Sequence, residues 1–125
     1  MLLRKRHDLA ITTAQMTVRE EFVLDKLSKR VLGILVTSDR DEMIFHRGTI
    51  CVILSGEEVI PEGHHTKLLM SGLGVAPDDR FLSLDLLPGN GALKVAYTDN
   101  THSVQPFAAH AVHVYLLIEI DEPGQ

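Results

Sequence analysis

The sequence predicts an α+β fold in which two helices cover one face of a mostly antiparallel sheet. Three observations lead to this prediction. Apolar residues alternate between a helical period and a two-residue period along the chain, as in mixed α/β proteins. The expected elements follow the βαββαβ order of ferredoxin-like domains. Glycine-rich turns and a proline mark several of the boundaries between them.

The first third of the chain is expected to form a strand, a helix and a second strand. Residues 9–14 are β-prone. Thr17 and Glu20 match a capping box, in which each side chain accepts the backbone amide of the other residue. An apolar stripe at helical spacing follows, made of Phe22, Val23, Leu27, Val31 and Ile34. Residues 32–36 either prolong this helix or form a strand entered through Gly33, and we favour the strand.

The middle of the chain is expected to hold a turn, a buried strand and the second helix. The polar residues 38–42 are typical of a turn. Residues 49–56 form a β-branched run bounded by glycines, which favours a buried strand. Pro61 and Glu62 then open a short helix that ends near Gly72 or Gly74.

An additional C-terminal hairpin and strand are expected to complete the sheet. Residues 80–87 alternate as a strand, and 88–91 (PGNG) form a turn from which 92–98 return as the hairpin partner. Residues 111–120 form the last strand. In a ferredoxin-like fold the sheet face without helices commonly packs against another subunit or a ligand. The mean hydropathy is slightly positive although aromatic residues make up only 5% of the chain, so we expect a homo-oligomer, a dimer or a trimer.

Composition bounds the classes of protein to which the chain can belong. Its 125 residues, 45% hydrophobic and 23% charged, predict one domain over 1–125, with 1–7 and 121–125 expected to be mobile. The single cysteine, Cys51, excludes an intrachain disulfide and a cysteine zinc cluster, and its apolar neighbours favour a buried role. The net charge of −5 argues against a nucleic-acid partner.

Localisation is expected to be cytoplasmic. Residues 1–15 hold no apolar run of signal-peptide length. No stretch reaches the roughly 20 apolar residues that a membrane-spanning helix needs, so no membrane partner is expected.

The last expected strand places three polar side chains on one sheet face. Alternation along the strand sends valine, leucine and isoleucine to the core and sends His113, Tyr115 and Glu119 to the opposite face. An imidazole, a phenol and a carboxylate on one face could transfer protons to or from a bound molecule, which makes these residues the catalytic candidates. The same alternation also describes a solvent-exposed strand face or a subunit interface.

Two adjacent histidines provide an alternative, metal-binding candidate. His64 and His65 follow the expected start of the second helix, and Glu62 precedes them. Helical neighbours point about 100° apart, so one metal rarely takes both, and the positions three and four residues further on hold lysine and leucine. A divalent metal at Glu62, His64 and His65 would therefore need a distant ligand. The alternative is a purely structural role for these residues at the start of a helix, where the helix dipole favours acidic side chains.

Arg80 and Lys94 are candidate ligand-binding residues, because isolated cations can anchor an anion if the fold brings them together. The glycine-rich segments match neither the dinucleotide-binding nor the phosphate-loop spacing, and the nucleophile elbow of the α/β-hydrolases is missing. The sequence therefore points to no particular cofactor.

Two segments resemble known families. Residues 73–84 (LGVAPDDRFLSL) resemble the helix–PDDR–strand junction of the small tautomerases, a family that works through an amino-terminal proline freed by processing. Here Met1 is followed by Leu2. Residues 10–21 (AITTAQMTVREE) and 113–116 (HVYL) resemble the trimeric chorismate mutases, whose catalytic arginines and glutamate have no counterparts here. No functional residue is carried over from either family.

Together these observations predict a homo-oligomer that binds a small metabolite at a subunit interface. The predicted chemistry is a proton transfer of the isomerase or tautomerase type at the candidate catalytic face. Two alternatives stay open from the sequence: a divalent-metal-binding protein and a non-catalytic structural or adaptor subunit.

Overall fold

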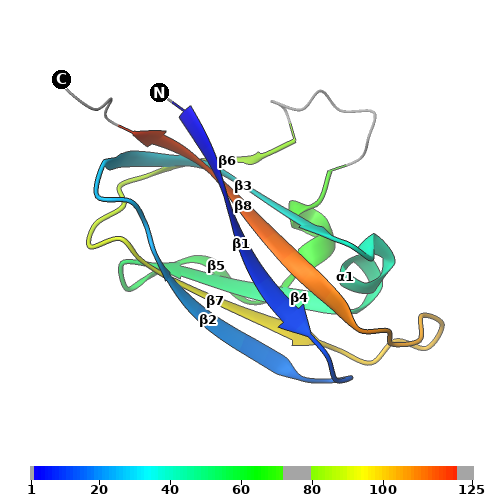
Figure 1. Ribbon diagram of the computed structural model, residues 1–125. Coiled ribbons are helices and arrows are strands. Elements are labelled where there is room, and N and C mark those ends of the chain that lie inside the picture. The colour runs from blue at the N-terminus through cyan, green and yellow to red at the C-terminus, as the bar shows by residue number, and fades with distance from the viewer. Residues whose placement is uncertain (1, 72–79, 121–125) are drawn as a thin grey trace.

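The computed structural model describes residues 2–71 and 80–120 and shows a mostly β protein (Figure 1). Within these residues eight strands form two four-stranded antiparallel sheets that lie one above the other. Sheet A contains, in spatial order, β1 (Leu2–Ile11), β8 (His110–Ile120), β3 (Ser28–Ser38) and β6 (Leu82–Leu86). Sheet B contains β2 (Thr17–Val23), β7 (Ala92–Asp99), β4 (Gly48–Leu54) and β5 (Glu57–His65).

The strands pair as the two arms of one long hairpin. β1 pairs with β8, β2 with β7, β3 with β6 and β4 with β5, all antiparallel. The tip of this hairpin is the tight turn at Ser55 and Gly56, both with positive φ, as a two-residue β-hairpin loop requires. Rolling the long hairpin into two sheets gives the strand order of a jelly roll. The arrangement brings the two ends of the described chain together in one sheet.

Alternating side chains build the core between the two sheets. Along β8 every second side chain is buried, and β4 and β7 show the same alternation. The inward positions carry apolar residues, and the largest fully buried ones are Tyr97, Leu9, Ile11, Ile34, Ile44, Ile50, Leu69, Leu93 and Ile118. The helix α1 (Asp41–Arg47) and the 3₁₀ helix η1 (Thr66–Leu69) lie at one end of the sandwich (Figure 1). No helix in the described ranges is long and apolar enough to cross a membrane.

The ferredoxin-like prediction with two helices on one face is wrong. The expected first helix is β2, a turn and the start of β3. At the turn, the Asp25 carboxylate accepts the Leu27 amide at 2.8 Å and the Asp25 carbonyl accepts the Ser28 amide at 3.0 Å. Such an aspartate turn ends β2 and reverses the chain, so the helical spacing of the apolar residues on either side was coincidental.

The prediction of a second helix opening at Pro61 and Glu62 is also wrong, because both residues lie in β5. Because the Ser55–Gly56 turn folds this segment back onto β4, its backbone groups are used in sheet pairing. Only η1 has helical character, and the expected ends at Gly72 and Gly74 lie outside the described residues. Conversely, α1 begins inside the segment predicted to be only a turn, residues 38–42.

The strands predicted at 32–36, 49–56, 80–87, 92–98 and 111–120 are present as β3, β4, β6, β7 and β8, although β4 ends at Leu54. The predicted hairpin between 80–87 and 92–98 is wrong. β6 belongs to sheet A and β7 to sheet B, so the PGNG turn carries the chain from one sheet to the other. Its turn bond is present, from the Gly91 amide to the Pro88 carbonyl at 2.9 Å. Residues 2–7, expected to be mobile, lie in β1 and pair with β8, whereas 121–125 lie outside the described residues.

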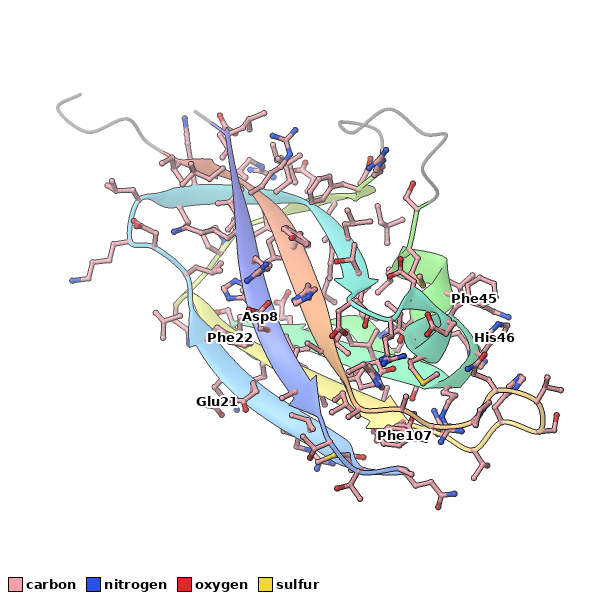
Figure 2. The ribbon with its side chains drawn as sticks, turned by 45° about the vertical axis from the view of Figure 1, so that its right-hand side comes forward. Asp8, Glu21, Phe22, Phe45, His46 and Phe107 are labelled. Atoms are coloured by element: carbon pink, nitrogen blue, oxygen red, sulfur yellow. The ribbon has the colours of Figure 1, made fainter. Side chains whose placement is uncertain are left out.

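A buried ion pair ties the α1 end of the molecule together. Arg47 is 6% exposed and Asp99 1% exposed. The Arg47 guanidinium donates to both Asp99 carboxylate oxygens, at 2.9 and 2.8 Å, and to the Gln105 carbonyl at 2.9 Å. The Gln15 amide also donates to Asp99, at 2.8 Å. Phe107, labelled in Figure 2, covers the guanidinium. The distance from the Arg47 Cζ to the ring centre is 5.6 Å.

Replacement of Asp99 tests how much this pair contributes to stability. Asp99→Asn leaves the Arg47 charge buried without its counter-charge, which should lower the free energy of unfolding by about 3–5 kcal/mol. Urea unfolding followed by circular dichroism measures the change. The control is Asp85→Asn, which removes the exposed carboxylate that pairs with Arg30 and should cost about 1 kcal/mol or less. Equal losses in the two variants would contradict the prediction.

The same pair predicts an acid dependence of stability. Burial alone raises the pKa of Asp99, but hydrogen bonds from Arg47 and the Gln15 amide, with the Arg47 charge, outweigh it and lower the pKa below 3.8. A carboxyl with a lowered folded pKa stabilises the fold above its unfolded pKa, and this stabilisation is lost as the pH falls through the folded pKa. The stability gap between the native protein and Asp99→Asn should therefore narrow below about pH 4. A gap that stays constant down to pH 2 would rule this out.

Candidate functional site

The polar face predicted for the last strand is the outer face of sheet A. His113 and Tyr115 point outward from β8, while Val114 between them points into the core. Glu119 lies on the same face, four residues further along the strand, or roughly 13 Å from Tyr115. Its cross-strand neighbours are Leu2 and Arg30. Two of the three predicted catalytic residues are therefore adjacent, and the third is apart.

The first strand supplies partners that sequence reasoning missed. Asp8 lies opposite His113, and Arg6 lies opposite Tyr115. One carboxylate oxygen of Asp8 accepts from His113 Nδ1 at 2.7 Å and from Arg6 Nε at 3.0 Å. Hydrogen bonding to Tyr115, followed by the Asp8 charge, raises the pKa of Arg6. We call these four residues, Arg6, Asp8, His113 and Tyr115, the Asp8 cluster.

The charge of Asp8 sets the orientation of the His113 ring. The hydrogen bond with His113 is the main cause that lowers the pKa of Asp8, and the Arg6 charge adds to it against a smaller opposing effect of burial. Asp8 is thus a carboxylate that can only accept, so His113 Nδ1 must donate to it. The second ring nitrogen, Nε2, is left for another partner. The His113 side chain is 21% exposed, so part of it is accessible from the outside.

A groove of about 490 Å³ lies on the outer face of the other sheet. The floor of the groove contains two small side chains, Ala96 of β7 and Cys51 of β4. These residues are cross-strand neighbours, and their small size leaves the sheet surface hollow between the larger side chains around them. At one end of the groove, three threonine hydroxyls form a row across adjacent strands, from Thr17 of β2, Thr98 of β7 and Thr49 of β4. Asp8 lies on β1 of sheet A and Glu21 on β2 of sheet B (Figure 2), so the groove and the Asp8 cluster belong to different faces.

Charges of both signs line the groove. Arg19 of β2 and Lys94 of β7 provide cations beside the carboxylates of Glu20 and Glu21, and Glu62 of β5 lines the opposite side. Burial, and then the negative charges of Glu58 and Glu62, raise the pKa of the Cys51 thiol. The thiol is therefore protonated near neutral pH and is a poor nucleophile. The groove is suited to binding rather than to covalent chemistry.

The candidate ligand-binding and metal residues are distributed over both sheets. Lys94 lines the groove, whereas Arg80 precedes β6 of sheet A and is not among the lining residues. Glu62 lines the groove as well. His64 lies opposite the buried Ile50 and His65 opposite the outward Thr49, so the two rings leave β5 on opposite sides. Across 2–71 and 80–120 no group of three histidine, cysteine, aspartate or glutamate side chains could hold a metal ion.

The missed residues had a weak signal in the sequence. Leu3, His7, Leu9 and Ile11 alternate with Arg4, Arg6, Asp8 and Ala10, which is a strand pattern that extends ahead of the β-prone residues 9–14. The three consecutive basic residues obscured this pattern. Even with β1 recognised, its pairing with a strand more than a hundred residues later could not be read from local sequence.

Comparison with protein-family models, with curated proteins and with solved structures found no match for this chain. A function must therefore be inferred from the two arrangements themselves. The Asp8 cluster combines an imidazole hydrogen-bonded to a carboxylate with a guanidinium and a phenol, and the groove combines a floor of small side chains with charges of both signs.

The reactivity of Cys51 tests the electrostatics of the groove. Because alkylation proceeds through the thiolate, iodoacetamide should react with Cys51 in the folded protein more slowly than in urea at the same pH. The double variant Glu58→Gln/Glu62→Gln should react faster than the native protein, since both charges raise the pKa of the thiol. Mass spectrometry over time measures the rate, with Glu57→Gln on the same strand as the control. No acceleration in the double variant relative to this control would show that the two carboxylates do not act on Cys51.

Proposed function

We propose that the Asp8 cluster is the acid–base centre of a homo-oligomer that binds a small molecule and moves one of its protons. The observation that supports this proposal is the sharing of one Asp8 oxygen by His113 and Arg6, at 2.7 and 3.0 Å. A carboxylate that orients an imidazole is the usual arrangement for a general base. Arg6 and Tyr115, on the same face, supply a positive charge and a hydroxyl for an oxygen of the substrate.

The reaction class that fits is an isomerisation of a small carbonyl acid. His113 Nε2 takes a proton from the carbon next to the carbonyl. The electron pair of that C–H bond forms a C=C bond, and the π pair of the C=O bond moves onto the carbonyl oxygen. Arg6 and Tyr115 stabilise the resulting enolate, while Asp8 stabilises the imidazolium. Return of the proton to a different atom gives the isomer. Atoms and charges balance with no further reactant.

The proposal includes a second subunit over the outer face of sheet A. His113 and Tyr115 lie on an open sheet face, and water there would weaken the interactions that stabilise an enolate. The same face carries the half-buried apolar side chains Leu35 and Leu117, which flank Tyr115 and can pack against another copy. A dimer or trimer closed in this way would place the cluster at a subunit interface.

Deuterium exchange tests the proposed chemistry directly. The protein is mixed in D₂O with a panel of small 2-oxo acids and 1,3-dicarbonyl compounds, and loss of the C–H signal is followed by proton NMR. For at least one compound we expect exchange above the buffer rate, and His113→Gln should reduce this enhancement by about 10²-fold or more. Asp8→Asn should reduce it as well, because the ring loses the group that orients it. Lys29→Gln, an exposed change on β3, is the control.

Two outcomes would reject the proposed function. One is exchange at the buffer rate for every compound of the panel. The other is an enhancement that survives in His113→Gln, because the base would then lie elsewhere. Native mass spectrometry on the same samples tests the assembly, where a bare monomer at all protein concentrations would contradict the closing subunit. Leu35→Asp should then lower both the subunit number and the exchange rate.

A further inference from the structure

We infer that the groove of sheet B is a second ligand site, and that it takes a small zwitterion with a carboxylate at one end and an ammonium at the other. The inference is independent of the proposed function, since the groove shares no residue with the Asp8 cluster. Its volume of about 490 Å³ falls within the range of small-molecule sites. The small floor residues Ala96 and Cys51 let a ligand lie close to the sheet.

The β2–β7 side of the groove holds two cations, Arg19 and Lys94, beside the carboxylates of Glu20 and Glu21, and Arg19 is the group that fits a ligand carboxylate. Arg19 has no ion pair among the described residues. Lys94 contacts Glu21 at 3.7 Å, but both side chains are more than half exposed, so the contact is weak and Lys94 can turn to a ligand. The planar guanidinium of Arg19 can hold a carboxylate through two parallel hydrogen bonds.

The anionic side fits an ammonium group. Glu62 lines the groove from β5. Of the two carboxylates that raise the pKa of the Cys51 thiol, Glu58 has the larger effect and Glu62 the smaller one. In the described part of the chain neither glutamate has an ion pair. Glu62 lines the groove and Glu58 lies opposite the lining residue Ile53, so the β5 side of the floor is electronegative. A cationic group placed there would gain their attraction.

The strand spacing sets the length of the ligand. Neighbouring strands lie about 4.8 Å apart, so β2 and β5 are separated by roughly 14 Å and β7 and β5 by roughly 10 Å. The charged side chains extend from these strands over the floor, which shortens the gap that a ligand must span. A molecule whose two charges are several bonds apart fits this gap better than an α-amino acid such as glycine.

The other lining residues narrow the ligand class. The hydroxyls of Thr17 and Thr98 lie 2.9 Å apart, and Thr49 accepts from the Asn100 amide at 3.2 Å. They can donate to the ligand carboxylate beside Arg19. None of the residues lining the groove is aromatic. A sugar ring or a nucleobase, which usually stacks on an aromatic side chain, is therefore a poor fit.

Calorimetric titration with a matched series of compounds tests the inference. The series is glycine, β-alanine, 4-aminobutyrate, 5-aminopentanoate and 6-aminohexanoate, with butyrate and butylamine as singly charged analogues. We expect affinity to rise from glycine to one of the longer zwitterions, which should bind at least about 10-fold more tightly than either analogue. Arg19→Gln and Glu62→Gln should each weaken this binding about 10-fold. Lys26→Gln, outside the groove, is the control.

The alkylation rate of Cys51 reports whether the ligand binds in the groove. Because the thiol lies on the floor, a zwitterion bound in the groove should slow its alkylation by iodoacetamide, and His113→Gln should change neither affinity nor protection. Any one of three results would overturn the inference: no heat of binding at millimolar concentrations, equal affinity for butyrate or butylamine, or binding that leaves Cys51 unprotected. A failure of the deuterium-exchange experiment leaves these outcomes unaffected, because it concerns the opposite face.

Discussion

The pairing of the first strand with the last is the constraint on which the rest of the structure depends. Once β1 lies along β8, the remaining strands pair inward in order until the turn at Ser55 and Gly56. Every strand then presents one face to the core and one to the outside. The same pairing sets Asp8 beside His113, although 105 positions separate them in the chain. Fold and candidate site thus follow from one set of contacts.

The buried pair of Arg47 and Asp99 supports this pairing at the end where the chain passes between the sheets. Its four hydrogen bonds reach α1, β7, the segment before β2 and the segment before β8. Those segments carry the chain from sheet A to sheet B and back. A buried pair of this kind contributes less to stability than its bonds suggest, because both ions lose water. Its main effect is to fix which segments meet.

The two outer faces differ in the chemistry that they can perform. On sheet A the Asp8 carboxylate contacts an imidazole and a guanidinium, and the guanidinium is hydrogen-bonded to a phenol, which suits proton transfer. On sheet B charges of both signs surround a floor of small side chains, and burial with the nearby carboxylates raises the pKa of the floor thiol, which suits reversible binding. The core between the sheets is mostly apolar, and both candidate sites lie on the outer faces of the sheets.

Local sequence determined the strands with strong alternation and the outward direction of His113 and Tyr115, because a two-residue period depends only on the strand itself. It also supplied Lys94 as a candidate ligand contact. It misread Thr17–Val23, whose capping-box residues and spacing fit a helix as well as a strand, and it paired residues 80–87 with 92–98. Only the tertiary structure decided these points, together with the partners of His113 and the existence of the groove. The physical reason is that strand pairing is made of hydrogen bonds between distant segments, which neither segment encodes alone.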